Sequence, residues 1–280
     1  MNLDAIQLAL REAGLDGWLF YDHHHRDPLA YRILGLIDSL HVTRRWFYLI
    51  PAEGGPKKLV HRIEQGRLDT LPGSKAVYST WQELEARLAE MLEGRTRLAM
   101  QYSPRNAIMY VSLVDAGTVE LLRGMGKQIV SSADLVSHFE AVLNEEQIAS
   151  HYAAQRALDI ILAEGFREIG ARVRRDTHAT TEFAMVTWLR EAMRRENLVW
   201  DDGPNVSVNQ NTSDSHYEAT AGCTQPITAG DFVLIDIWAR KNVPGSVFYD
   251  ITWTGVVNRE PNERECQVFE TVAAARDAAI

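Results

Sequence analysis

The spacing of apolar and polar residues divides the chain up to about residue 130 into short strands and helices. Apolar residues recur at helical spacing in two segments, and compact apolar runs between turn residues predict strands. In chain order the pattern predicts a helix at 3–13, strands at 17–21, 45–51, 57–63 and 76–79, a helix at 81–92 and a strand at 97–102. This order predicts an α/β domain with a mixed sheet.

The pattern changes near Ser131, where longer helices begin. A helix is predicted at 134–143, and Asn144 then starts a new one, with Gln147 placed to reach back as in a capping box. Further helices are predicted from Thr180 or Thr181 to about 195 and from about 262 to 280. We therefore predict two domains, 1–132 and 133–280.

Two strand-like runs near the C-terminus each hold one aspartate among apolar residues. Asp236 lies in the run 232–239, and Asp250 lies in the run 247–257. Burying a carboxylate costs several kcal/mol unless it is paired, hydrogen-bonded or bound to a metal. Two such aspartates on consecutive strands indicate a site.

A simple hairpin would bring these two carboxylates together. Asp236 and Asp250 are equally far from Val243, and Pro244-Gly245 is a turn signal. Directly opposed residues have Cβ atoms roughly 5 Å apart. At that distance one carboxyl takes a proton, or cations sit between the two, as in sites with paired divalent ions. A bulge in the loop would change the register, and the alternative is two aspartates that cap loops or accept from backbone N–H groups.

Composition narrows the class of protein. The 280 residues are 46% hydrophobic and 24% charged, and 38 acidic against 29 basic residues give a net charge of −9, which argues against nonspecific nucleic-acid binding. The two cysteines, Cys223 and Cys266, fit neither a disulfide framework nor a zinc ribbon. No signal peptide and no apolar run long enough to span a membrane is visible, so we expect a cytoplasmic protein.

The second part of the chain resembles the pita-bread (M24) metallopeptidases, which include Xaa-Pro aminopeptidases, prolidases and methionine aminopeptidases. The resemblance rests on segments whose order, spacing and strand context agree: 203–205, 216–217, 230–236 and 250–252. Residues before Ser131 are similar to the N-terminal domain of the aminopeptidase P, prolidase and creatinase branch. The resemblance implies an α/β (α+β) protein in which a creatinase-like mixed-sheet domain precedes an incomplete pita-bread catalytic domain.

The resemblance also implies roles for three residues. Asp236 matches the first metal-binding aspartate of the family, and Asp250 matches the second, which bridges both ions. His216 matches a catalytic histidine that helps to hold the substrate or the tetrahedral intermediate. The expected cofactors are two divalent ions (Mn, Co or Zn), the expected substrate is a short peptide with proline after the scissile bond, and the expected assembly is a homodimer.

The sequence departs from the family pattern in three places. The loop at 240–247 is longer, and Trp253 stands where the family often has an arginine that would tune charge near the metals. The histidine and the two glutamates that complete the family's five metal ligands have no counterpart after Asp250. Four glutamates that do follow are predicted to lie on a solvated helical face: Glu260, Glu263, Glu265 and Glu270. We therefore expect weak or absent metal binding and an inactive piece of a longer enzyme.

Two other functions stay open at this point. One is a metal-free amidinohydrolase like creatinase, and the other is a non-catalytic homologue that serves as a binding or assembly module. The run His23-His24-His25 does not indicate a metal cluster, because adjacent side chains on a strand alternate faces. We predict that it forms a polar loop or the rim of a pocket.

Overall fold

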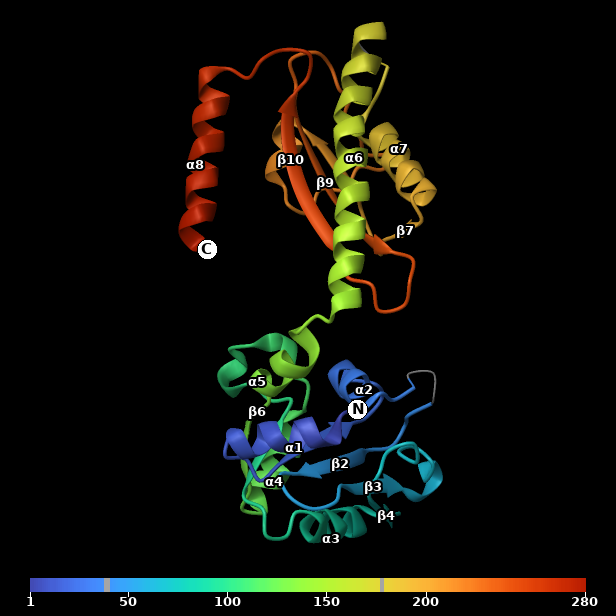
Figure 1. Ribbon diagram of the computed structural model, residues 1–280, viewed down its shortest axis with the longest axis vertical. Helices are drawn as coiled ribbons and strands as arrows, with labels where there is room; N and C mark the ends of the chain where they lie inside the picture. The colour runs from blue at the N-terminus through green and yellow to red at the C-terminus, as the bar shows by residue number, and fades with distance from the viewer. Residues whose placement is uncertain (38–40, 177–178) are drawn as a thin grey trace. The chain divides into compact units, whose positions relative to one another are not determined.

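The computed structural model describes residues 1–37, 41–176 and 179–280, which form two compact units, Met1–Val142 and Leu143–Ile280 (Figure 1). Within the described ranges, none of the helices combines the length and the hydrophobicity that a membrane span requires.

The first unit is built on a six-stranded mixed sheet with the order β4-β3-β2-β1-β5-β6. The β1–β2 and β2–β3 pairs are antiparallel, and the other three pairs are parallel. The mixed sheet predicted from the sequence is therefore confirmed. Its strands are β1 (Gly17–Asp22), β2 (Trp46–Pro51), β3 (Lys57–His61), β4 (Ser74–Tyr78), β5 (Arg97–Met100) and β6 (Gln128–Ser131).

Helices cover both faces of this sheet and bury its strands. Trp18 and Phe20 of β1 pack in one hydrophobic cluster, and Leu19 and Tyr21, which point the opposite way, pack in another. The first cluster includes residues of three helices: α1 (Leu3–Glu12), α2 (Pro28–Leu34) and α5 (Ala133–Val136). The second includes residues of two: α3 (Trp81–Met91) and α4 (Ala116–Gly124). Because α5 packs into this unit, the unit extends ten residues beyond the boundary predicted near residue 132.

The three consecutive histidines lie in the turn between β1 and α2. The carboxylate of Asp22, which is almost fully buried, accepts hydrogen bonds from the backbone N–H groups of His25, Arg26 and Asp27. His24 and His25 have φ values of 63° and 55°, a left-handed conformation that these contacts hold in place. The rings of His23 and His24 lie edge to face with centroids 4.3 Å apart, whereas the ring of His25 faces Tyr31 at 4.9 Å, so the three imidazoles do not form one metal-binding group.

In the second unit, two long helices lie on one face of a four-stranded sheet. Its elements are α6 (Glu145–Arg175), α7 (Glu182–Arg195), β7 (Leu198–Val199), β8 (Asn205–Val208), β9 (Phe232–Lys241), β10 (Tyr249–Val256) and α8 (Glu263–Ala279). Strand β9 is central and pairs antiparallel with β7, β8 and β10. The capping box predicted at the start of α6 is confirmed: Asn144 Oδ1 accepts from Gln147 N–H at 2.8 Å, and Gln147 Oε1 accepts from Asn144 N–H at 2.9 Å.

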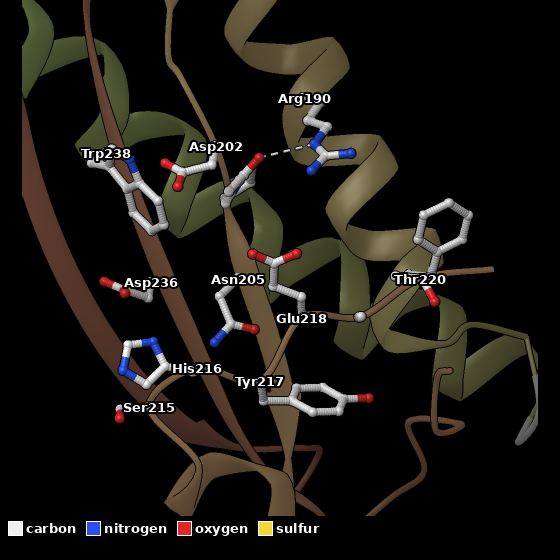
Figure 2. Close-up of a pocket in the computed structure, with 14 residues that line it drawn as sticks. Arg190, Asp202, Asn205, Ser215, His216, Tyr217, Glu218, Thr220, Asp236 and Trp238 are labelled. Atoms are coloured by element: carbon white, nitrogen blue, oxygen red, sulfur yellow. Dashed lines mark hydrogen bonds between the residues drawn. The ribbon is translucent and has the colours of Figure 1, made fainter. Parts of the chain in front are cut away.

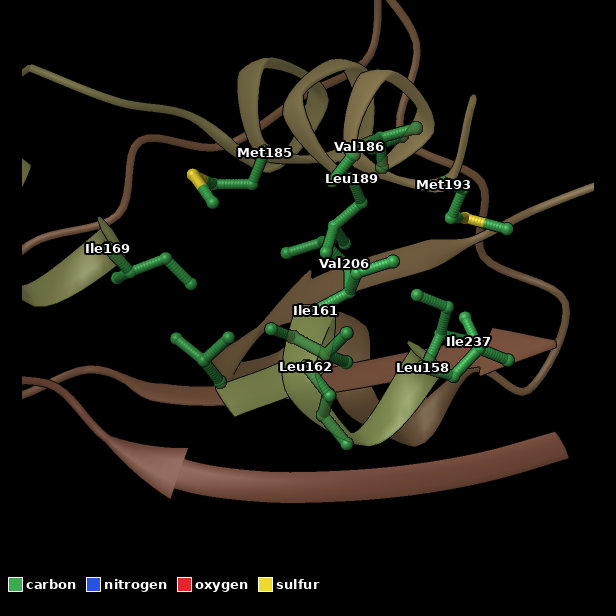
Figure 3. Packing of buried hydrophobic residues seen from close by; sticks show 14 of the residues in the cluster. Leu158, Ile161, Leu162, Ile169, Met185, Val186, Leu189, Met193, Val206 and Ile237 are labelled. Atoms are coloured by element: carbon green, nitrogen blue, oxygen red, sulfur yellow. The ribbon is translucent and has the colours of Figure 1, made fainter. Parts of the chain in front are cut away.

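The alternating burial of β9 decides which residues face the candidate site. Ile235 and Ile237 are fully buried in the core that α6 and α7 form with the sheet (Figure 3). Leu234, Asp236 and Trp238 lie on the opposite face and are only partly buried. The sheet thus has one face packed against helices and an open face, on which the side chains of β9 and β10 are partly buried or exposed. The helix α8 has no buried residue.

Candidate functional site

The two aspartates lie on the open face of the β9–β10 hairpin, but they are not directly opposite each other. Asp236 pairs with Thr252, and Asp250 pairs with Trp238. The simple hairpin centred on Val243 is therefore wrong by two residues in the pairing, because Asp236 lies opposite Thr252 instead of Asp250 and the observed pairs centre on Pro244. The two carboxylates share a face as diagonal neighbours, a relation that places residues about 7–8 Å apart.

The aspartates are also less buried than their apolar surroundings predict. Asp236 is partly buried and Asp250 is exposed. The reason is that the alternate residues of the strands, such as Ile235, carry the hydrophobic contacts on the helix-covered face. The carboxylates therefore do not need a metal merely to offset burial, and the case for a site rests on their surroundings.

Neighbouring groups act on both carboxylates. The Thr252 hydroxyl donates to Asp236 Oδ1 at 2.5 Å, which leaves Oδ2 of Asp236 for other partners. Desolvation by neighbouring atoms raises the pKa of Asp250, and the negative charge of Asp236 raises it further. The repulsion between these carboxylates is what a bound cation would relieve.

A cavity of about 250 Å³ brings His216 and Asp236 together (Figure 2). His216 comes from the loop between β8 and β9, and Asp236 comes from β9 itself. Asp250 is not among the residues that line this cavity. Of the three residues predicted to form the site, two thus line one cavity and the third lies diagonally across the hairpin.

The cavity is acidic. Its lining includes three carboxylates, those of Asp202, Glu218 and Asp236, and one guanidinium, that of Arg190. Arg190 Nε donates to the carbonyl oxygen of Gly203 at 2.9 Å, which fixes the side chain at the cavity wall. An excess of carboxylates favours a cationic ligand, such as a divalent ion or the amino terminus of a peptide.

Sequence reasoning missed most of the groups around His216. Arg190 and Glu182 both lie in the helix predicted at 180–195, where a charged residue ordinarily indicates only a solvated face. Glu182 is instead fully buried and bonded to the loop that carries His216. Asp202 lies beside the Gly203-Pro204-Asn205 turn, whose sequence indicated a turn but no cavity.

Two departures from the family pattern have structural outcomes. Trp253 pairs with Ile235, so it lies on the face of the sheet opposite to the aspartates. Glu265 caps α8 and pairs with Arg259, whose hydrogen bond lowers the pKa of Glu265 to about 2. Among the residues that the structure describes, no three His, Cys, Asp or Glu side chains are grouped closely enough to hold a metal ion.

The sequence and the fold were compared with those of known proteins. Residues 152–280 match the model of metallopeptidase family M24. The search of curated proteins found no significant match. Three similar solved structures are the prolidase of Pyrococcus horikoshii OT3 (19% identity, TM-score 0.57), the dipeptidase PepE of Mycobacterium ulcerans (18%, 0.62) and the prolidase of Pyrococcus furiosus (17%, 0.55).

These similarities cover nearly all of this chain and part of each known structure. They include 99%, 95% and 97% of this chain, in the same order, and 71%, 66% and 70% of the matched chains. At these identities the likeness concerns the fold. The predicted resemblance is therefore confirmed: residues 152–280 match metallopeptidase family M24, and nearly the whole chain is similar in fold to prolidases and a dipeptidase.

Proposed function

We propose that this chain contributes to a peptidase site that depends on divalent metal ions and hydrolyses short peptides with proline after the scissile bond. Asp236 and Asp250 are the proposed metal ligands, and His216 is the proposed catalytic residue. The observation that carries the proposal is the pair of carboxylates on one open sheet face, close enough for the charge of Asp236 to raise the pKa of Asp250. The match to family M24 supports it.

The residues present fit a cation that is held in part by the protein and in part by water. Carboxylate oxygens suit hard divalent ions, and two carboxylates supply only part of a coordination shell. Ions held there would supply an activated water for attack on the peptide carbonyl. The proposed selectivity for proline rests on the family resemblance and not on any residue of the cavity.

The other named residues have roles that depend on charge and hydrogen bonding. The imidazole of His216, at the wall of the same cavity as Asp236, can donate to an oxyanion that develops on the carbonyl oxygen. Asp202 and Glu218 can attract the ammonium of a peptide. The Thr252 hydroxyl holds one oxygen of Asp236 and so fixes the direction of the other.

Replacing either aspartate with asparagine is expected to weaken Mn²⁺ binding about tenfold or more. The wild-type chain should bind Mn²⁺ with a dissociation constant on the order of 1 mM, because few charged ligands are present. Loss of one carboxylate then removes half of the protein's negative charge at the ion. Titration of Mn²⁺ followed by electron paramagnetic resonance measures the free ion directly. Asp277→Asn, an exposed aspartate on α8, serves as the control.

Equal Mn²⁺ affinity in wild type, Asp236→Asn and Asp250→Asn would remove the metal site from the proposal. A second experiment addresses the reaction: Xaa-Pro dipeptides and longer Xaa-Pro peptides are incubated with the chain and added Mn²⁺. Release of the amino-terminal residue that stops in Asp250→Asn supports the peptidase function. Hydrolysis that is unchanged by this substitution would contradict it.

A further inference from the structure

The carboxylate of Glu182 is fully buried at the first residue of α7, and it gathers hydrogen bonds from segments far along the chain. Its Oε1 accepts from the backbone N–H of Val208 at 2.8 Å and from Asn211 Nδ2 at 3.0 Å. Its Oε2 accepts from the Tyr217 hydroxyl at 2.5 Å and from the backbone N–H of Gln225 at 2.7 Å. These partners span residues 208–225, which include His216.

The chemistry of these four partners requires a carboxylate. Two are backbone N–H groups and one is the NH₂ of a side-chain amide, so three of them can only donate. Each oxygen of Glu182 meets at least one of these three donors. A glutamine at position 182 has the same shape, but its NH₂ group would point at one of these three donors in either orientation of the amide. A carboxyl group, in contrast, has an acceptor oxygen on both sides.

The contact between α7 and this loop is reciprocal. The backbone N–H of Glu182 donates to the carbonyl oxygen of Gln225 at 3.0 Å, and the N–H of Phe183 donates to the Thr224 hydroxyl at 3.0 Å. These N–H groups belong to the first turn of the helix, where no intrahelical acceptor exists. The backbone of the helix start thus bonds the end of the loop, while the Glu182 side chain bonds its beginning, middle and end.

We propose that Glu182 is the positioning residue that holds the loop 209–225, and through Tyr217 the neighbouring His216, at the wall of the cavity. His216 itself is exposed, and its backbone N–H donates to Asp214 Oδ1 within the same loop at 3.0 Å. That contact shapes the loop but does not attach it to the sheet or the helices. Next to His216 the attachment comes from Tyr217, which packs against the hydrophobic core and donates its hydroxyl to Glu182. Burial and this bond raise the pKa of Tyr217. The value of this role for catalysis rests on the function proposed above.

Glu182→Gln is expected to raise hydrogen exchange in 209–225 about tenfold to a hundredfold, because buried donors lose their acceptor and the loop opens more often. Exchange in α6 and β9 should stay unchanged. Hydrogen-exchange mass spectrometry of the full chain, without metal or peptide, measures both. Glu191→Gln, an exposed residue on the same helix, is the matched control and should leave every segment unchanged.

A second readout follows His216 directly. In Glu182→Gln the imidazole proton resonances of His216 should move toward the shifts of an unstructured histidine, and in Glu191→Gln they should not move. If Glu182→Gln does not fold, Tyr217→Phe decides, because it removes one donor and leaves the carboxylate three; it should raise exchange at 214–220 only. Equal exchange of 209–225 in wild type and variants, or a uniform rise over the whole second unit, would overturn the proposal. Neither outcome bears on metal binding, so the two proposals can fail separately.

Discussion

Gly203→Ala is expected to destabilise the second unit by about 2–5 kcal/mol. Gly203 has a φ of +78°, and a methyl group built on it would lie 2.6 Å from Cζ2 of Trp238. The left-handed conformation costs a non-glycine residue about 1–2 kcal/mol, and overpacking typically costs a further 1–3 kcal/mol. Because Trp238 lines the cavity, the ring would have to move into it.

Gly245→Ala is the matched control for this substitution. Gly245 has nearly the same φ, +77°, but no atom lies within 4 Å of the position of an added methyl group. It should therefore show the conformational cost alone, about 1–2 kcal/mol. Urea unfolding gives both values, and near-ultraviolet circular dichroism reports the environment of the tryptophans. Equal losses in the two variants would mean that the contact between Gly203 and Trp238 contributes nothing.

Asp27→Asn is expected to change the free energy of unfolding of the first unit in a pH-dependent way. Relative to wild type, the variant should gain on the order of 3 kcal/mol of stability between pH 4 and pH 8. Burial raises the pKa of Asp27 to about 7, and the charge of Asp22 adds to the effect, against the lowering by the Ala30 N–H. Between about pH 4 and 7 the unfolded chain therefore loses this proton while the folded chain keeps it. The contribution of Asp27 to the stability of the wild type therefore falls over that range. Asparagine does not titrate, so the variant does not lose this stability.

The substitution should keep the local structure, because Asp27 caps α2 by accepting from Ala30 N–H at 2.9 Å and asparagine caps equally well. Asp115→Asn at the start of α4 provides a control of opposite sign. Burial raises the pKa of Asp115, but hydrogen bonds from Thr118 outweigh it and leave the pKa lowered. Urea unfolding at pH 4, 6 and 8 compares the three chains. A difference between wild type and Asp27→Asn that does not change with pH would contradict the assignment.

The sequence predicted most elements because their signals are local. The capping box of Asn144 and Gln147, the apolar strand runs and the turn glycines depend on residues within a few positions of each other. The helix α4 and the strand β6 were not predicted, because the stretch 103–130 mixes turn residues with short apolar runs. The first unit ends at Val142 and not near residue 132, as predicted. The reason is that α5 follows β6 directly, and the contacts that join α5 to the first unit are tertiary.

The sequence predicted part of the geometry of the candidate site. A period of two along β9 and β10 was sufficient to place Asp236 and Asp250 on one face, but the register depends on how the loop 242–248 closes. The burial of Glu182 could not be predicted, since its partners lie 26 to 43 residues away. A glutamate in the first turn of a helix ordinarily indicates only a favourable interaction with the helix dipole.

The division of β9 into a packed face and an open face has a consequence for variation in this strand. Saturation mutagenesis should give two interleaved profiles. At 233, 235, 237 and 239, polar substitutions should reduce the amount of folded protein, because these side chains fill the core. At 234, 236 and 238, many substitutions should leave abundance intact and alter ligand binding. Natural selection on this strand would thus act on the stability of the fold at the odd-numbered positions and on ligand binding at the even-numbered ones.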